Sequence, residues 1–288
     1  PISSNQWIDE FNEYKKYPEY KNLNFNMTIN EYKKIYYWEY THRMIGRLIG
    51  FLFFLPFIYF YFKNYLKKKI IKKLLFLLFL GSLQAFMGWY MVKSGLVDNP
   101  HISHYRLSIH LLLAFIIIGN IYKIELSLKY FTPKKNLNFK YFNRFLNVII
   151  FLFFLQIIYG SFTAGLKAGK IWNTFPLMDG KIIPDNLFVM YPIYLNFLEY
   201  DKMIQFMHRS IGLLLMITIY IFSFQIKDLN PILNSKSRVL IVLISCQIFL
   251  GIVTLISKVS IILALSHQFL AIFLLLQLIN TKHFLKYR

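Results

Sequence analysis

The sequence of 288 residues contains very little cysteine and few charged residues. Its one cysteine, Cys246, lies inside an apolar run, so cysteine alone can form neither a disulfide nor a zinc or iron–sulfur site. The 12 glycines and 9 prolines stand against 21 tyrosines and 30 phenylalanines, which excludes a low-complexity or fibrous chain. Charged residues make up 16% of the chain, whereas 57% is hydrophobic and the mean hydropathy is +0.46. This is more apolar surface than one soluble core can bury.

The apolar residues are gathered into long runs. A membrane-spanning helix needs ~20 mostly apolar residues. Seven runs qualify, namely residues 36–62, 74–92, 105–122, 145–166, 203–226, 239–256 and 261–280. None shows the polar–apolar alternation of barrel strands, which favours helices. The sequence therefore predicts an all-α protein with seven transmembrane helices.

The net charge of +20 is concentrated in alternate connections. Residues 63–73, 123–144, 227–238 and 282–288 carry +16 of it, whereas residues 1–34, 93–103 and 167–202 each balance to zero. Because cytoplasmic loops hold the excess of Lys and Arg, we expect the C-terminus on the cytoplasmic (matrix) side and residues 1–34 outside. A bacterial inner membrane, or a mitochondrial inner membrane, is the expected location. Basic residues placed between apolar runs do not indicate a nucleic-acid partner.

Two halves of the chain, residues 1–142 and 143–288, repeat the same motifs in the same order. H-R-x-x-G occurs at 42–46 and 208–212, Q-x-x-x-G at 84–88 and 247–251, and a Ser-His-bearing helix follows in each half. A further Q-x-x-x-G at 156–160 precedes the second H-R-x-x-G, and its counterpart would lie before residue 1. We therefore expect two pseudo-symmetric four-helix bundles, the first lacking its first helix. We interpret Q-x-x-x-G itself as plain helix packing.

Four histidines, His42, His110, His208 and His267, lie within the apolar runs. Each follows the outer start of its helix by about five to eight residues, which places all four at one depth of about 8 to 12 Å. Two imidazoles facing each other at one depth suit paired axial ligation of a heme, whereas a proton relay would cross the bilayer. A hydrogen-bonded core role remains the alternative for any one of them. The other histidines, His101, His104 and His283, are expected to be solvated.

Four arginines, Arg43, Arg47, Arg106 and Arg209, accompany these histidines on the expected outer side. Anionic heme propionates would compensate them, since the planar guanidinium binds carboxylates. The alternative is that they extend to the lipid headgroups.

The two halves differ at the position three residues before the first histidine, where Glu39 in one half corresponds to Gln205 in the other. A carboxyl near the membrane interior can carry protons, so the difference predicts chemistry at the first site and cofactor binding at the second. The alternative is an ion pair between Glu39 and Arg43 on one helical face.

These motifs together resemble the heme A synthase family. The resemblance covers essentially the whole chain and lies in E-Y-T-H-R-M-I-G-R at 39–47, in residues 84–95, 105–110 and 160–180, in 205–209 and 265–268, and in the outer segment near Trp7 and residues 14–20. It implies two four-helix bundles and oxidation of the C8 methyl of heme O to a formyl group by successive hydroxylations.

The resemblance further implies that Glu39 is the catalytic carboxylate. By position, His42 and His110, with Arg43, Arg47 and Arg106, would hold heme O, whereas His208 and His267, with Arg209, would bind a heme b cofactor. The partners implied are heme O, heme O synthase, cytochrome oxidase assembly factors and membrane lipid.

Two other functions fit parts of the pattern. A di-heme cytochrome b that only transfers electrons would use the same paired histidines, although such carriers usually place hemes near both membrane surfaces. A transporter would be expected to have helices broken at mid-membrane, and Pro56 is the only proline inside a predicted span. Both rank below the synthase.

Overall fold

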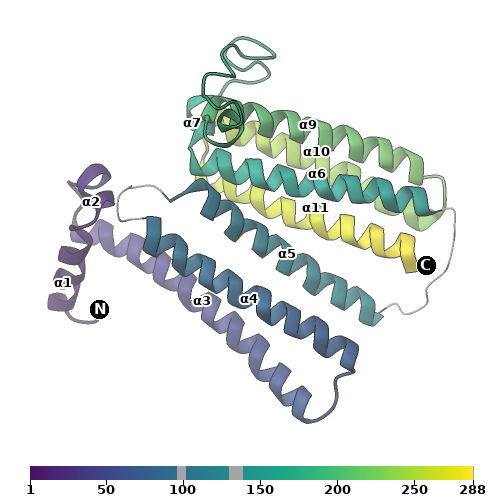
Figure 1. Ribbon diagram of the computed structural model, residues 1–288, viewed down its shortest axis with the longest axis horizontal. Coiled ribbons are helices and arrows are strands. Elements are labelled where there is room, and N and C mark those ends of the chain that lie inside the picture. The colour runs from purple at the N-terminus through teal and green to yellow at the C-terminus, as the bar shows by residue number, and fades with distance from the viewer. Residues whose placement is uncertain (96–101, 130–138, 288) are drawn as a thin grey trace. The chain divides into compact units, whose positions relative to one another are not determined.

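The structure is a computed structural model, and it describes residues 1–95, 102–129 and 139–287 (Figure 1). His101 lies outside these residues. Within them the chain is helical and contains no strand, with one isolated bridge between Met178 and Lys181. The all-α prediction is therefore confirmed.

Seven helices are long and apolar enough to cross a membrane, which confirms the predicted spans. They are α3 (Ile29–Phe62), α4 (Lys68–Gly95), α5 (His104–Lys129), α6 (Lys140–Gly165), α9 (Asp201–Ile226), α10 (Pro231–Ile256) and α11 (Ile261–Tyr287). All seven extend beyond the predicted apolar run at one or both ends, because helical hydrogen bonding continues through charged residues whose long side chains reach polar surroundings. The protein is a multi-pass membrane protein.

Four shorter helices lie outside the spans: α1 (Ser4–Tyr14), α2 (Pro18–Leu23), α7 (Ala168–Ile171) and α8 (Leu195–Leu198). Capping motifs mark the starts of two helices, α1 and α3. Ser3 and Gln6 form a capping box at α1, and Thr28 and Glu31 form one at α3, so backbone N–H groups at each helix start are satisfied by side chains.

The described residues form two compact units, 1–113 and 114–288, which meet inside α5. The second part of α5 packs closely on α11, where a Cβ at Gly119 would lie 3.0 Å from Cδ1 of Ile279. This packing assigns that part of α5 to the second unit. The halves predicted from the repeat divide the chain later, between residues 142 and 143.

The second unit contains a four-helix bundle of α6, α9, α10 and α11 (Figure 1). Contacts run around a ring from α6 to α9, α10, α11 and back to α6. The bundle interior is apolar, and Leu146, Ile149, Ile219, Leu240 and Leu278 are fully buried there. In such a ring α9 and α11 are diagonal neighbours, so side chains from these two helices can face each other across the interior.

In the first unit, α1 and α2 fold against the start of α3 through aromatic side chains. Trp7, Phe11 and Tyr32 are buried, and Tyr14 and Tyr20 pack around them. Asn24 donates a hydrogen bond of 2.8 Å to the Tyr14 hydroxyl, which fixes the end of α2. The segment before the first span is therefore a folded cap on α3.

Candidate functional site

Three of the four histidines within the spans lie against a glutamine and a glycine of the helix that precedes them in the bundle. Gln84 and Gly88 of α4 flank His110 of α5, Gln156 and Gly160 of α6 flank His208 of α9, and Gln247 and Gly251 of α10 flank His267 of α11. The same arrangement thus occurs once in the first unit and twice in the second.

The glycines allow the imidazole rings to approach the neighbouring backbone. A Cβ at Gly88 would lie 3.2 Å from Cε1 of His110, and one at Gly160 would lie 3.1 Å from Cε1 of His208. At Gly251 the distance to Cε1 of His267 would be 3.0 Å. Such contacts are tighter than most Cβ contacts, so a side chain there would shift the ring, and each glycine forms part of the ring's seat.

The glutamines place their amides beside the ring nitrogens. Nε2 of Gln84 lies 3.3 Å from Nε2 of His110, Nε2 of Gln156 lies 3.1 Å from Nδ1 of His208, and Nε2 of Gln247 lies 3.4 Å from Nε2 of His267. The interpretation of Q-x-x-x-G as plain helix packing was therefore incomplete. The signal that sequence reasoning missed is that a motif of this spacing lies on the neighbouring helix of each of these three histidines.

Several buried polar atoms at these seats have no hydrogen-bond partner within the described part of the chain. They are Oε1 of Gln84, Gln156 and Gln247, and Nδ1 of His110 and His267. Buried polar groups are normally satisfied, so unsatisfied ones indicate a missing partner. A heme iron would take one ring nitrogen of each histidine. The other ring nitrogen would then carry N–H and donate to the glutamine Oε1, which is a usual arrangement around metal-bound histidine. The residues present therefore fit axial ligands of a heme.

The predicted histidine pairs are each brought together within one unit. His208 and His267 lie on the diagonal helices α9 and α11 and are close enough to interact electrostatically, as are His42 and His110. Among the described residues there is no cluster of three or more His, Cys, Asp or Glu suited to a metal ion. A pair of imidazoles without further protein ligands would suit a heme, whose ring nitrogens supply the other iron ligands.

His42 differs from the other three. It is exposed on α3, and no Gln–Gly pair flanks it among the residues that the structure describes. Its neighbour Glu39 is also exposed, and Oε2 of Glu39 lies 3.6 Å from Nη1 of Arg43. The ion pair considered as the alternative for Glu39 is thus present, although an exposed pair of this length contributes little to stability. The corresponding Gln205 is buried, and its Oε1 has no partner in the described chain.

The arginines make different contacts in the two units. Arg209 donates hydrogen bonds of 2.7 Å to the carbonyl oxygens of Trp172 and Thr174, and so fastens the connection after α7 to the start of α9. Its Nε is buried without a partner in the described chain. Arg106 lies over the ring of Tyr90 at 4.9 Å, and Arg47 is exposed.

Two of the histidines expected to be solvated are not. His104 is only 7% exposed and is the first residue of α5, where its ring packs on that of Tyr105 with centroids 4.1 Å apart. The aromatic neighbour favours burial, and sequence position gave no sign of it. His283 is partly buried near the end of α11.

Residues 1–279 match the model of a family described as cytochrome oxidase assembly protein. The chain belongs to this family. Members with curated names include a heme A synthase of Wolbachia pipientis, which is 43% identical over 93% of this chain and 75% of its own length. A heme A synthase of Nitrosospira multiformis is 42% identical over 93% of this chain and 76% of its own length. A heme A synthase of Flavobacterium johnsoniae is 39% identical over 98% and 84% of the two chains.

Membership of the cytochrome oxidase assembly family agrees with the resemblance inferred from the motifs. All of the histidines, glutamines and glycines of the three seats lie within the matched residues. One histidine pair lies in each unit, and Glu39 lies in the first unit.

Proposed function

We propose that this chain is a heme A synthase, an oxidoreductase that converts heme O to heme A. Membership of the cytochrome oxidase assembly family and the three relatives of that name support the proposal. The observation that supports it within this chain is that three of the four histidines are each seated by a Gln–Gly pair with unsatisfied polar atoms. The reaction converts the C8 methyl to a formyl group through successive hydroxylations and loss of water.

The two units would hold different hemes. His42 and His110 would bind the substrate heme O, with the exposed Arg43 and Arg47 and the ring-stacked Arg106 available to its propionates. In the second unit His208 and His267 would bind heme b, with Arg209 beside them. When bound, heme b supplies one-electron redox chemistry.

Glu39 would transfer protons at the substrate site. It lies one helical turn from His42 on α3, and its side chain is 57% exposed, so protons can pass between it and water. Its carboxyl group would accept a proton released when the methyl carbon is oxidised. The buried Gln205 at the corresponding place in the second unit cannot do this, which supports heme storage or electron transfer there rather than oxidation.

The proposed site lies in the outer leaflet of a bacterial inner membrane, or of the mitochondrial inner membrane, with the C-terminus on the cytoplasmic (matrix) side. The distribution of basic connections supports this orientation. A farnesylated heme O would arrive through the lipid. The proposed partners are heme O synthase, as the source of heme O, and cytochrome oxidase assembly factors, as recipients of heme A.

The test is heme A formation in a host that makes heme O and lacks its own heme A synthase. The protein is expressed from its full gene, and the extracted hemes are analysed by mass. We expect heme A with the natural sequence and none with Glu39→Gln, which retains both heme sites. Glu31→Gln is the matched control, because glutamine preserves the capping box that Glu31 forms with Thr28. Normal heme A yield from Glu39→Gln would remove this residue from the mechanism, and no heme A from the natural sequence would refute the proposed function.

A further inference from the structure

The connection between α7 and α9 carries an unusual concentration of exposed apolar side chains. Tyr191 is 95% exposed and Ile182 is 82% exposed. Five more large apolar residues of the same stretch are exposed, namely Ile183, Phe188, Val189, Ile193 and Tyr194. We name residues 182–194 the apolar loop. Soluble surfaces rarely gather so many apolar side chains in one place unless the place contacts a partner or a membrane.

The backbone of the apolar loop is fixed from inside by one amide. Asn196 is fully buried, and its Oδ1 accepts hydrogen bonds of 2.9 Å from the N–H groups of Val189 and Met190. Its Nδ2 donates hydrogen bonds of 2.9 Å to the carbonyl oxygens of Met190 and Ile193. Both donors and both acceptor positions of the side chain are therefore used. The loop is a built element that holds its apolar side chains outward.

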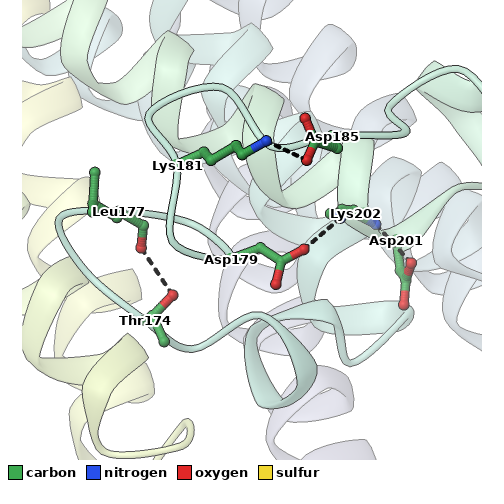
Figure 2. Close-up of polar contacts among 7 residues, drawn as sticks. All are labelled: Thr174, Leu177, Asp179, Lys181, Asp185, Asp201 and Lys202. Atoms are coloured by element: carbon green, nitrogen blue, oxygen red, sulfur yellow. Dashed lines mark hydrogen bonds and ion pairs between the residues drawn. The ribbon is translucent and has the colours of Figure 1, made fainter.

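Four charged residues within and next to the apolar loop form two ion pairs, as Figure 2 shows. Nζ of Lys181 lies 2.5 Å from Oδ2 of Asp185, and Nζ of Lys202 lies 2.8 Å from Oδ2 of Asp179. The side chain of Lys202 is only 7% exposed, and its ammonium lies 4.6 Å from the centre of the Trp172 ring. Paired charges lower the cost of moving this segment next to a medium of low dielectric.

The start of α9 is covered, although α9 is a membrane span. None of its residues from Asp201 to Gly212 is exposed, a stretch of about 18 Å at the helical rise per residue. α7 and α8 both pack against α9, so the connection contributes to this cover. Beyond it, α9 presents the apolar side chains of Leu213, Leu214, Ile217 and Ile221 outward. The connection thus lies against the part of the span where lipid would otherwise contact α9.

We infer that the apolar loop is seated in the bilayer interface beside the start of α9, with its side chains among the headgroups and upper acyl chains of phospholipid. Tyrosine and other aromatic rings favour this region, and apolar side chains gain by leaving water there. The occupant of this surface is lipid because the loop continues the lipid-facing side of α9 and because its neighbouring charges are already paired. The second unit would thereby be anchored by its outer connection as well as by its spans.

The experiment uses the single cysteine of the chain. In a Cys246→Ala background, Tyr191→Cys and Ile182→Cys are each labelled with an environment-sensitive NBD probe, and the full chain is reconstituted into phosphatidylcholine vesicles. Ile217→Cys serves as the reference within a span, and Glu10→Cys on α1 serves as the exposed reference in water. Quenching is measured with aqueous iodide and with lipids that carry a shallow spin label.

We expect the probes at Tyr191 and Ile182 to be quenched by the spin-labelled lipid and to show an iodide quenching constant several-fold below that at Glu10. Iodide quenching equal to that at Glu10, with no quenching by lipid, would overturn the inference. A surface that binds a protein partner would also be quenched by iodide and not by lipid, because no protein partner is present in the vesicles. The outcome does not depend on heme A formation.

Discussion

Three glycines determine how closely the helices approach the histidine rings. Gly88, Gly160 and Gly251 each leave a ring carbon 3.0 to 3.2 Å from where a Cβ would be, whereas Gly81 on α4 has nothing within 4 Å. A methyl group at the first three positions must therefore displace an imidazole or the backbone. Comparing an alanine substitution at one of these three positions with one at Gly81 therefore distinguishes an effect on the histidine site from an effect on helix stability.

Gly160→Ala is predicted to weaken heme binding in the second unit, because the added methyl would lie 3.1 Å from Cε1 of His208. In an open helical position the same change would stabilise the helix by about 1 kcal/mol, so general destabilisation is not the expected cause. The measurement is heme b content per protein after purification, with Gly81→Ala as the control. Equal heme content in the two variants would show that the glycine is not part of the seat.

Glu19 makes the folded cap of α1 and α2 sensitive to pH. Burial, and next the charge of Glu39, raise the pKa of Glu19 above its ordinary value of 4.5, while the Tyr14 hydroxyl donates to its carboxylate. A raised folded-state pKa means that the folded cap binds the proton more tightly than the unfolded segment does. The free energy of unfolding of the cap therefore falls as the pH rises above 4.5 and is highest when Glu19 is protonated.

Hydrogen exchange of the α1 and α2 amides, corrected for the intrinsic rate, measures this dependence. We expect protection to decrease between the ordinary and the raised pKa of Glu19, and the Glu19→Gln variant to lose the dependence. Glu10→Gln, an exposed position on α1, should retain it. An unchanged pH profile in Glu19→Gln would assign the effect to another group.

The histidines could be selected from the sequence because a titratable side chain within an apolar run is costly and needs a reason. The roles of Gln84, Gln156 and Gln247 could not, because an amide in a helix packs equally well against any polar neighbour. The burial of His104 depends on the ring of Tyr105 and on the register of α5, which apolar runs do not define. The partners of these side chains could therefore be identified only from the structure.

The membrane spans were predictable because each apolar run is as long as a bilayer is thick. The short helices α1, α2, α7 and α8 were not predicted. They are stabilised by contacts, such as the packing of Phe11 on Tyr32 and the hydrogen bonds of Asn196, and not by their own periodicity. A helix of four to eleven residues is marginal in isolation, so its sequence carries little signal.

Asn196→Ala is predicted to loosen the connection before α9, because it removes four hydrogen bonds, two from backbone N–H groups and two to carbonyl oxygens. A hydrogen bond contributes about 0.5–1.5 kcal/mol net, so the loss of four should lower local stability by at least about 2 kcal/mol. Hydrogen exchange of residues 187–194 measures the change, and Asn5→Ala on the exposed surface of α1 is the control. Exchange rates equal to those of the control would mean that the amide does not hold the loop.

At the scale of the whole molecule, a repeated architecture carries two unequal sites. The motifs repeat, and the seat of His110 in the first unit matches those of His208 and His267 in the second. The units differ at Glu39, which is exposed, and at Gln205, which is buried. This difference supports the proposal that one unit holds a cofactor and the other carries out the reaction. The repeat was evident from sequence, whereas the different exposure of these two side chains was not.

The most direct test of the account is the reduced-minus-oxidised visible spectrum of the purified protein together with its histidine variants. We predict a low-spin heme with two imidazole ligands, loss of the heme b component in His208→Ala and in His267→Ala, and its retention in His283→Ala near the end of α11. A heme b spectrum that is unchanged in His208→Ala, or a protein that remains colourless when heme is supplied, would contradict the assignment of these histidines.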